Sequence, residues 1–205
     1  MFKVFKRAFD LCSALALLIA ISPIFLLLAL AVLIDMGWPV FFTQERSGKD
    51  MKNFKLMKFR SMNNKKDKEG NLLPDNMRVS KFGRMLRSSS LDELPELINI
   101  IKGDMSVIGP RPLPARYNEY FTDYEKNRFK VRGGLITPDS VDEKTIIPWD
   151  KQFDYEAKYA LNLSLKEDLK IFFSVFRILF KRGGDDYGSY MRKPFDVERK
   201  EKMGK

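Results

Sequence analysis

The stretch from Arg84 to Pro112 holds the residues of this chain that are best suited to chemistry. An adjacent acidic pair, Asp92 and Glu93, follows several arginines and serines and precedes a Pro110-Arg111-Pro112 turn. Two carboxylates, fixed guanidinium groups and a helix N-terminus can together hold a divalent metal ion and a phosphate-bearing substrate. The alternative interpretation is a capped surface helix whose charges are solvated.

The residues around the acidic pair predict how it is presented. Ser90 is followed three residues later by Glu93, a capping box that predicts a helix from Leu91 with both carboxylates in its first turn. Arg84 and Arg87 lie just before this helix start, whose free N–H groups favour anions. The predicted core-facing side of the helix consists of Leu94, Leu97, Ile98 and Ile101.

The turn that follows predicts a fixed arginine. Pro110 and Pro112 restrict the backbone on both sides of Arg111, so its guanidinium group is presented with little conformational freedom to lose.

Composition narrows the chemistry that the chain can perform. The 205 residues suit one domain of moderate size, and a net charge of +10 indicates an anionic partner. The chain has no histidine, which excludes His-based metal sites and Ser-His-Asp or Cys-His catalysis. Its single cysteine, Cys12, excludes an internal disulfide and is expected to be a packing residue. Asp, Glu, Lys and Tyr side chains and a bound metal ion that prefers oxygen ligands remain as candidates for catalysis.

The N-terminal region predicts a membrane segment. An uncharged run of 24 residues extends from Leu11 to Ile34, and as one straight helix it would measure about 36 Å, enough to cross a hydrocarbon core of about 30 Å. Ser22-Pro23 lies in its middle, and proline removes a backbone hydrogen bond and kinks the helix at the carbonyl of Ile19. The run is too long for a signal peptide and continues past the cleavage-like Ala29-Leu30-Ala31.

The break permits either a kinked span or a helix-break-helix hairpin. Basic residues flank the run on both sides, which favours the hairpin because both flanks then look cytoplasmic. These residues are Lys3, Lys6 and Arg7 before the run and Arg46, Lys49, Lys52, Lys55 and Lys58 after it.

The remaining chain predicts a small β component among helices. Strands are expected at 40–43 and 54–62, followed by a surface loop at 63–80 and a short helix from Lys81. A helical and aromatic segment is expected at 113–130 and a loop at 131–148. Helices are expected at 149–161 and at 165–182, the second of them after a Ser164/Glu167 capping box. The last helix suits a membrane interface as well as a core. Three parts are predicted: a membrane hairpin at 1–36, a catalytic domain at 37–182 and a polar flexible tail at 183–205.

Three further groups are candidates for contact with a substrate. Lys58 and Arg60 lie on a predicted strand that could deliver them to a site, whereas Lys49, Lys52 and Lys55 fit a solvated or lipid-facing patch. Arg132 precedes a Gly-Gly pair that could approach a phosphate or nucleotide closely.

These segments together resemble a known family. The broken N-terminal helix, FTQERSGKD, FKLMKFRSM, SLDELPEL and KGDMSVIGPRP look like the monotopic phosphoglycosyl transferases, bacterial sugar transferases that initiate lipid-linked glycan assembly. The chain resembles the minimal form that has only the catalytic domain. The match covers residues 1 to about 130 and returns from Trp149 to Arg182.

The resemblance implies a reaction and roles for particular residues. A phospho-sugar would pass from a UDP-sugar to polyprenyl (undecaprenyl) phosphate with release of UMP, and Mg²⁺ would be required. Asp92 matches the family's nucleophile and would form a covalent phospho-sugar intermediate and contact the metal, with Glu93 as its partner. Arg87 and Arg111 would neutralise phosphates and Lys58 would lie close to the dyad.

The resemblance also implies a location. It places a mostly α fold with a small β component (α+β) on the cytoplasmic face of the bacterial inner membrane, held by a re-entrant hairpin and interfacial helices. Membrane lipid is then a partner, and a homodimer or contact with downstream glycosyltransferases stays open. The chain departs from the family after Arg132, where it has Gly133-Gly134-Leu135-Ile136-Thr137-Pro138, so the sugar is not assigned.

One alternative from another functional class is a non-catalytic, membrane-anchored basic adaptor that binds anionic lipid or nucleic acid. Its nucleic-acid version is disfavoured because the chain has no recognised binding motif and its aromatic residues cluster with apolar ones.

Overall fold

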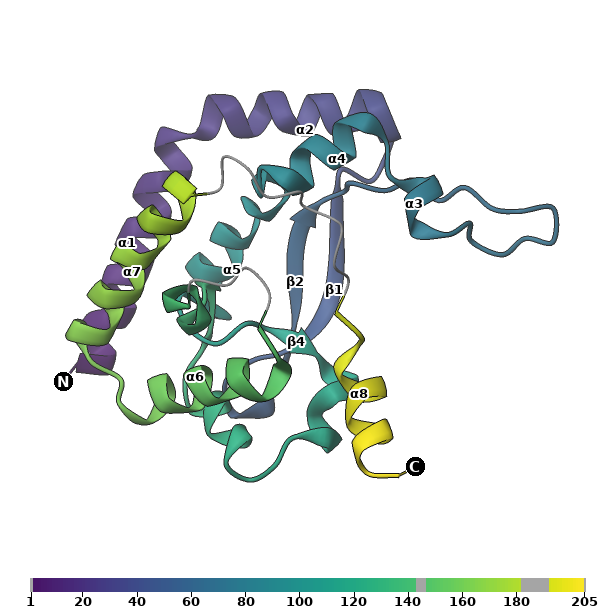
Figure 1. Ribbon diagram of the computed structural model, residues 1–205. Helices are drawn as coiled ribbons and strands as arrows, with labels where there is room; N and C mark the ends of the chain where they lie inside the picture. Colours follow the sequence, from purple (N-terminus) through teal and green to yellow (C-terminus); the bar gives the residue numbers. More distant parts are fainter. Residues whose placement is uncertain (1, 143–146, 182–191, 205) are drawn as a thin grey trace.

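Helices surround two small sheets in the computed structural model, which describes residues 2–142, 147–181 and 192–204 (Figure 1). The helices are α1 (Phe2–Ala20), α2 (Ser22–Met36), α3 (Asp75–Arg78), α4 (Lys81–Ser88), α5 (Glu96–Lys102), α6 (Trp149–Leu161), α7 (Leu165–Lys181) and α8 (Phe195–Lys202). The strands are β1 (Phe41–Ser47), β2 (Asn53–Phe59), β3 (Met105–Ile108), β4 (Leu113–Pro114) and β5 (Gly133–Ile136). Short 3₁₀ helices occur at Lys49–Met51, Leu91–Glu93, Ala115–Tyr120, Glu125–Lys130 and Pro138–Val141. The predicted mixed α+β class with a small sheet component is confirmed.

The N-terminal apolar run is broken where the sequence predicts. α1 and α2 meet at a bend of 68°, and the Ser22 hydroxyl donates to the Ile19 carbonyl at 2.8 Å, the acceptor that Pro23 leaves without its helical partner. Among the described residues no single helix is long and apolar enough to cross a bilayer, whereas this bent pair meets the requirement by length and composition.

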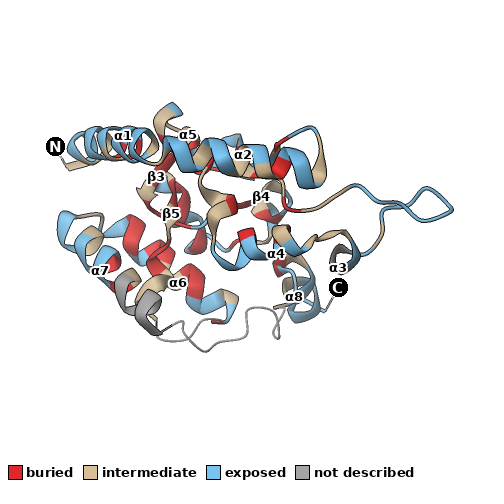
Figure 2. Cartoon of the chain, turned by 90° about the horizontal axis from the view of Figure 1, so that it is seen from above, coloured by how far each residue is buried: buried red, intermediate tan, exposed pale blue. Residues whose placement is uncertain are grey.

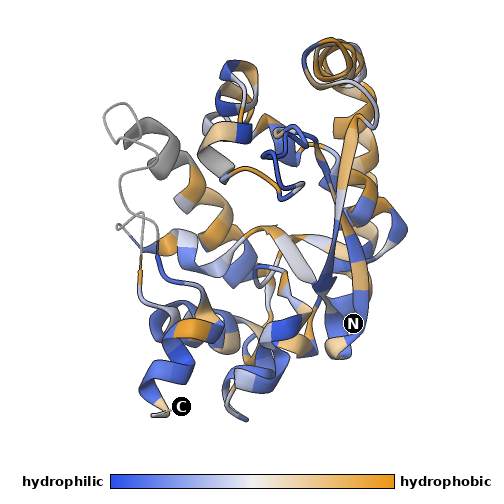
Figure 3. Ribbon diagram, turned by 90° about the vertical axis from the view of Figure 1, so that its right-hand side faces the viewer, coloured by the Kyte–Doolittle hydropathy of each residue, from blue (hydrophilic) through white to orange (hydrophobic). Residues whose placement is uncertain are grey.

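The outer surfaces of α1 and α2 are apolar and exposed. Figure 2 shows exposed residues along both helices, and Figure 3 shows α2, seen end-on at the top, as hydrophobic on nearly all sides. Leu26 and Leu27 are each 67% exposed, while Val32 is fully buried against the domain. Cys12 is exposed, so the expectation that it packs inside is wrong. Only one narrow side of each helix contacts protein. The other sides stay exposed although the run is hydrophobic all round.

The two predicted strands form one antiparallel hairpin. β1 pairs with β2 so that Phe42 lies opposite Lys58, and β4 adds to the other edge of β1. Side chains of a strand alternate between its two faces, so residues two apart share one face. Phe41 and Phe59 stack with ring centres 5.5 Å apart on the side that faces α2 and Phe25. The opposite face of the hairpin carries the polar side chains Gln44, Arg46 and Lys58 together with apolar neighbours.

The Gly-Gly pair has a structural role that the predicted loop does not anticipate. Residues 133–136 form β5, which runs parallel to β3. A Cβ atom at Gly134 would lie 2.0 Å from the backbone nitrogen of Gly109, so these two backbone segments approach more closely than a side chain at Gly134 would permit. The glycine pair therefore serves strand packing.

The capping box predicted at Ser90 is wrong. Ser90 has a left-handed backbone with φ 57°, and its side chain makes no capping hydrogen bond. A 3₁₀ turn carries Asp92 and Glu93, and α5 starts only at Glu96, because Pro95 lacks the N–H that a continuous helix would use. Freed from capping, Glu93 is available for another partner. The helical segment predicted at 113–130 likewise consists of β4 and two 3₁₀ helices.

The polar tail predicted at 183–205 is wrong for its described part, residues 192–204. α8 packs Phe195, which is 1% exposed, into an aromatic cluster with Tyr117, Phe121 and Phe153. One aromatic residue in a charged segment is too weak a periodic signal to predict this docking. Residues 183–191 lie outside the described part of the chain.

The two helices predicted before that segment are found. α6 spans Trp149–Leu161 as predicted, and the Ser164 hydroxyl accepts from the Glu167 backbone N–H at 3.4 Å, which places the second capping box at the start of α7. The predicted end at Arg182 lies outside the described residues.

We predict that Phe195→Ala destabilises the protein by about 3 kcal/mol, because it removes a fully buried ring from a packed cluster. Val197→Ala in the same helix is a matched control, since Val197 is 42% exposed. Chemical unfolding of both variants in one detergent measures the difference. Equal stabilities would show that α8 does not hold the core.

Candidate active site

The polar face of the β1–β2 hairpin borders a cleft of about 450 Å³. Phe42, Gln44 and Arg46 reach it from alternate positions of β1, and Leu56 and Lys58 reach it from β2. The charged residues that line the cleft are Arg46, Lys58, Arg60, Arg78, Arg87 and Asp92. One carboxylate thus faces five cations, a balance suited to a strongly anionic ligand such as a diphosphate.

Lys58 forms ion pairs with two of the acidic residues of the site. Its Nζ lies 2.6 Å from Glu93 Oε1 and 3.2 Å from Glu96 Oε1. Asp92 is 8% exposed, lines the cleft and forms no ion pair among the described residues. The proximity of Lys58 to the Asp92-Glu93 dyad is therefore present in the structure, and Glu96 is a third carboxylate that the sequence did not single out.

Two of the acidic residues, Asp92 and Glu96, have raised pKa values. Burial raises the pKa of Asp92, and the charges of Lys58 and Arg87 oppose this shift. Burial also raises the pKa of Glu96 to about 7, because the Lys58 charge offsets only part of the lost hydration. A poorly hydrated carboxylate attracts cations strongly, so both groups favour bound positive charge.

Arginines from separate elements converge on the cleft. Arg87, in the last turn of α4, donates its Nε to Ser61 Oγ at 3.0 Å and lies close enough to Asp92 to affect its pKa. Arg46 donates to Gln44 Oε1 at 2.6 Å, while its buried Nε has no hydrogen-bond partner in the described structure. Buried donors are nearly always bonded, so this Nε suits a ligand oxygen.

Arg46 and Arg78 are site residues that sequence reasoning missed. Gln44 and Arg46 lie two residues apart on β1, and Lys58 on β2 and Arg60 just after its end have the same spacing, so this period of two is a usable signal. Arg78 lies at the end of the segment predicted to be a plain surface loop, and no pattern marks it.

A buried ion pair forms hydrogen bonds with the backbone of the Pro110-Arg111-Pro112 turn. Arg111 donates its backbone N–H to Glu156 Oε1 at 3.0 Å, and its carbonyl accepts from Arg128 Nη2 at 2.5 Å. Arg128 and Glu156 pair with each other at 2.7 Å and are almost fully buried. The Arg111 side chain is exposed and is not among the residues that line the cleft, yet its charge affects the pKa of Arg46 and Glu96.

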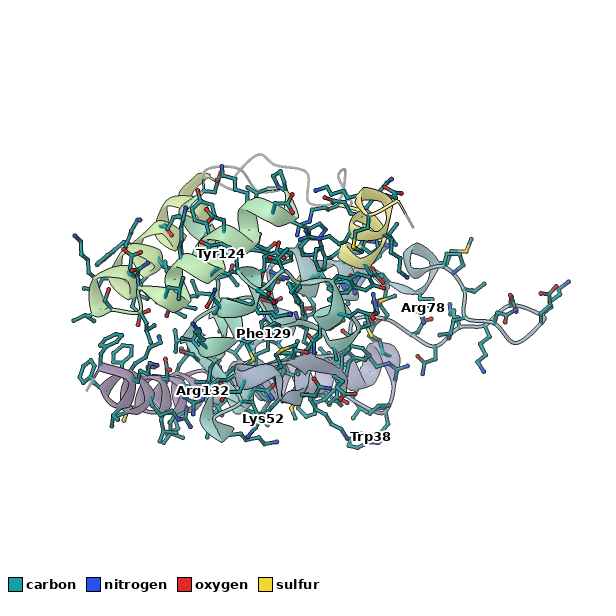
Figure 4. All side chains as sticks on the ribbon, turned by 90° about the horizontal axis from the view of Figure 1, so that it is seen from below. Trp38, Lys52, Arg78, Tyr124, Phe129 and Arg132 are labelled. Carbon is teal, nitrogen blue, oxygen red and sulfur yellow. The ribbon has the colours of Figure 1, made fainter. Side chains whose placement is uncertain are left out.

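Arg132 lies elsewhere. Its Nε donates to the Gly103 carbonyl at 2.7 Å, beyond the far end of α5 from Glu96. Figure 4 shows Arg132 beside α1 and Arg78 on the opposite side of the molecule. The structure therefore does not bring Arg132 to Asp92.

The residues present fit a Mg²⁺ ion that arrives with a diphosphate. Among the described residues no group of three or more Cys, Asp or Glu side chains could hold a metal without other ligands. Mg²⁺ commonly uses one or two carboxylates, water and substrate phosphates. Asp92 supplies one carboxylate toward the cleft, so the donor set suits a metal shared with the substrate.

Comparison with known proteins decides the family. Residues 1–182 match the family described as bacterial sugar transferase. This chain belongs to the bacterial sugar transferase family. It is an enzyme of the phosphoglycosyl transferase type, and the SLDELPEL and KGDMSVIGPRP segments that form the dyad and the Arg111 turn lie within the matched residues.

Several members of the bacterial sugar transferase family are similar over most of this chain. An uncharacterised sugar transferase, EpsL of Bacillus subtilis (strain 168), is 41% identical over 181 residues, which are 88% of this chain and 90% of EpsL. The UDP-glucose:undecaprenyl-phosphate glucose-1-phosphate transferase of Klebsiella pneumoniae is 38% identical over 85% of this chain and 40% of its own length. The exopolysaccharide production protein ExoY of Sinorhizobium fredii is 33% identical over 82% of each chain. The chain thus spans nearly all of EpsL but about two-fifths of the Klebsiella enzyme.

We predict that the free energy of unfolding of Glu96→Gln rises relative to that of the unchanged protein as the pH increases. Folding raises the pKa of Glu96 to about 7, so its contribution to stability is present below its unfolded pKa and is lost as pH rises through 7. A neutral amide avoids this loss, which amounts to roughly 2 kcal/mol between pH 5 and 8. Unfolding measurements at both pH values, with exposed Glu119→Gln as control, test it. A difference that does not change with pH would contradict the prediction.

Proposed function

We propose that this enzyme transfers a phospho-sugar from a UDP-sugar to a polyprenyl phosphate such as undecaprenyl phosphate. The products are a polyprenyl-diphosphate-sugar and UMP. The cleft carries the proposal, because a single cleft-facing carboxylate, Asp92, meets five cations there. The names of the relatives from Klebsiella and other bacteria support both substrate classes.

Two displacements at one phosphorus atom account for the reaction. A carboxylate oxygen of Asp92 attacks the phosphorus that bears the sugar, and the bond from that phosphorus to the bridging oxygen breaks. UMP leaves with the bridging oxygen and its electron pair. An oxygen of the polyprenyl phosphate then attacks the same phosphorus and displaces Asp92. Each step exchanges one phosphorus–oxygen bond for another and needs no external oxidant or reductant.

The cations of the cleft make the first displacement electrostatically feasible. A carboxylate and a diphosphate repel each other, so their approach requires fixed positive charge between them. Lys58 and Arg87 already act on the Asp92 carboxylate, and Arg46 offers a buried donor from the hairpin. Arg111 adds positive charge at the end of the site near Glu96.

Asp92 would share a Mg²⁺ ion with the phosphates of the UDP-sugar. When bound, the metal supplies charge neutralisation of the diphosphate and of the departing UMP. Glu93 would hold Lys58 in place, through their 2.6 Å contact, and so keep this cation beside the nucleophile.

The bent pair of α1 and α2 would enter the cytoplasmic leaflet of a bacterial inner membrane and return. Its exposed apolar surface requires cover, and its 68° bend at Ser22 and Pro23 suits a hairpin with both ends on one side. α7 would lie in the interface, since Leu165 and Phe173 are exposed. The active site then faces the cytoplasm, where a soluble nucleotide sugar and a bilayer-bound phosphate can both reach Asp92.

We predict that Asp92→Asn lowers UMP release by at least about a thousandfold, because the amide is a poor nucleophile. The assay uses detergent-solubilised protein, undecaprenyl phosphate, Mg²⁺ and a panel of UDP-sugars, with an EDTA arm in which release should stop. Asp123→Asn is the matched control, since its side chain is 99% exposed. Unchanged release by Asp92→Asn would remove the assigned nucleophile.

We predict that residues near both ends of the hairpin are labelled from the cytoplasmic side. In a Cys12→Ser background, Val4→Cys and Lys49→Cys place single thiols at exposed positions near the start of the hairpin and after its end. A membrane-impermeant maleimide should reach both in inverted membrane vesicles and neither in intact spheroplasts. Labelling from opposite sides would establish a span and contradict the hairpin.

A further inference from the structure

A second basic pocket, of about 80 Å³, lies near the N-terminal end of α1. Its lining cations come from three segments that are distant in sequence: Lys3, Lys6, Arg7, Lys49, Lys130 and Arg132. None of its lining residues also lines the cleft that contains Asp92. It is therefore a separate site.

The positive charge of this pocket is largely uncompensated. Arg7 donates to the carbonyls of Ile100 and Ile101 at 2.7 and 3.0 Å, and backbone carbonyls hold a guanidinium in place without neutralising it. Lys3 and Lys130 form no ion pair within the described residues. The single lining carboxylate, Asp10, is buried.

Two contacts show that Asp10 is already committed. It accepts from Ser106 Oγ at 2.7 Å and from the Val107 N–H at 3.1 Å. Within the described part of the chain, two of the lining cations have carboxylate partners outside the pocket lining: Lys6 pairs with Asp168 at 2.9 Å and Lys49 with Asp50 at 3.6 Å. An anion entering the pocket would meet several cations and little competing negative charge.

An apolar groove of about 540 Å³ lies next to the pocket, between α1 and α7. The two spaces share Lys6 and Asp10 in their linings. Aromatic and aliphatic side chains form most of the groove wall, including Phe5, Phe9, Leu17, Leu165, Leu169 and Phe172. Phe5 and Phe9 are 57% and 59% exposed at its rim. The cationic pocket and the apolar groove thus adjoin each other at Lys6 and Asp10.

We propose that pocket and groove together bind one anionic phospholipid of the bilayer. Its phosphate would lie among Lys3, Arg7, Lys130 and Arg132, and an acyl chain would occupy the groove between α1 and α7. The proposal rests on the proposed membrane association but not on the proposed reaction. A nucleic acid does not fit, since it requires an extended basic surface rather than a small pocket joined to an apolar groove.

A bilayer phospholipid fits better than the polyprenyl phosphate substrate. The substrate phosphate must reach the phosphorus attached to Asp92, whereas this pocket lies beyond the other end of α5. Arg7 and Arg132 both donate to carbonyls at the C-terminal end of that helix. A lipid phosphate bound between them would fasten α1 to the helix whose first residue, Glu96, belongs to the active site.

Native mass spectrometry of the full chain in detergent micelles tests the proposal. Dioleoyl phosphatidylglycerol should be retained at one molecule per chain, and dioleoyl phosphatidylcholine should not. Lys3→Gln/Lys130→Gln should weaken retention about tenfold by removing two cations, and Lys3→Arg/Lys130→Arg should restore it. Lys55→Gln/Lys166→Gln makes the same charge change at exposed positions outside the pocket and should retain the lipid.

A second variant tests the groove. Ser13→Phe adds a ring to the groove wall, where the Ser13 hydroxyl bonds only to the Asp10 carbonyl of its own helix. It should abolish the preference for dioleoyl over dihexanoyl phosphatidylglycerol. Equal retention of phosphatidylcholine, or equal loss in the test and control doubles, would overturn the proposal. Displacement of phosphatidylglycerol by undecaprenyl phosphate, with the same sensitivity to Lys3→Gln/Lys130→Gln, would instead assign the site to the substrate. UMP release is measured separately, so failure here is distinguishable from failure of the proposed reaction.

Discussion

The buried pair between Arg128 and Glu156 is the interaction on which the shape of the active site depends. Two charges removed from water are tolerated when most of their polar atoms have partners, and in the described structure Arg128 Nη1 is the one nitrogen of this pair's guanidinium that has none. Glu156 accepts from Gln152, Arg128 and the backbone of Arg111, while Arg128 lies over three aromatic rings at 5.0 to 5.3 Å. Because the pair bonds both the N–H and the carbonyl of Arg111, the turn cannot move without leaving a buried charge unsatisfied. The prolines restrict the turn, and this pair fixes where it lies.

Helix α5 then relates the cleft to the N-terminal helices. It is only seven residues long, with Glu96 at one end against Lys58 and its last carbonyls against Arg7 of α1. Cations at a helix C-terminus are favourable because they oppose the partial negative charge there. The position of α1 is therefore transmitted to the acidic cluster through one short, rigid element, which gives the bent α1–α2 pair a physical link to that cluster.

The sequence predicted the parts of this structure that depend on local chemistry. The break at Ser22 and Pro23, both hairpin strands and α6 follow from proline sterics and periodicity over neighbouring residues. Lys58 was placed near the dyad by family resemblance rather than by pattern. What could not be predicted depends on distant partners.

The misses show what kind of information was lacking. Ser90 adopts a left-handed backbone although its sequence context matches a capping box, because Pro95 delays the helix and Glu93 finds Lys58 instead. Glu156 lies on the apolar face of α6 between Phe153 and Ala157, a position that signals a buried charge but not its partner. Its pairing with Arg128 and the docking of α8 appear only when the chain is folded.

The distribution of ion pairs explains why Asp92, among three neighbouring carboxylates, suits the proposed role of nucleophile. Glu93 and Glu96 share Lys58, so their charge is directed toward a protein cation. Asp92 lines the cleft and, within the described chain, has no such pair, although Lys58 and Arg87 are close enough to lower its pKa against the effect of burial. It therefore keeps an oxygen for the substrate while nearby cations favour its ionised form. A metal ion entering the cleft with the substrate would increase that preference, since added positive charge stabilises the carboxylate that is proposed to attack.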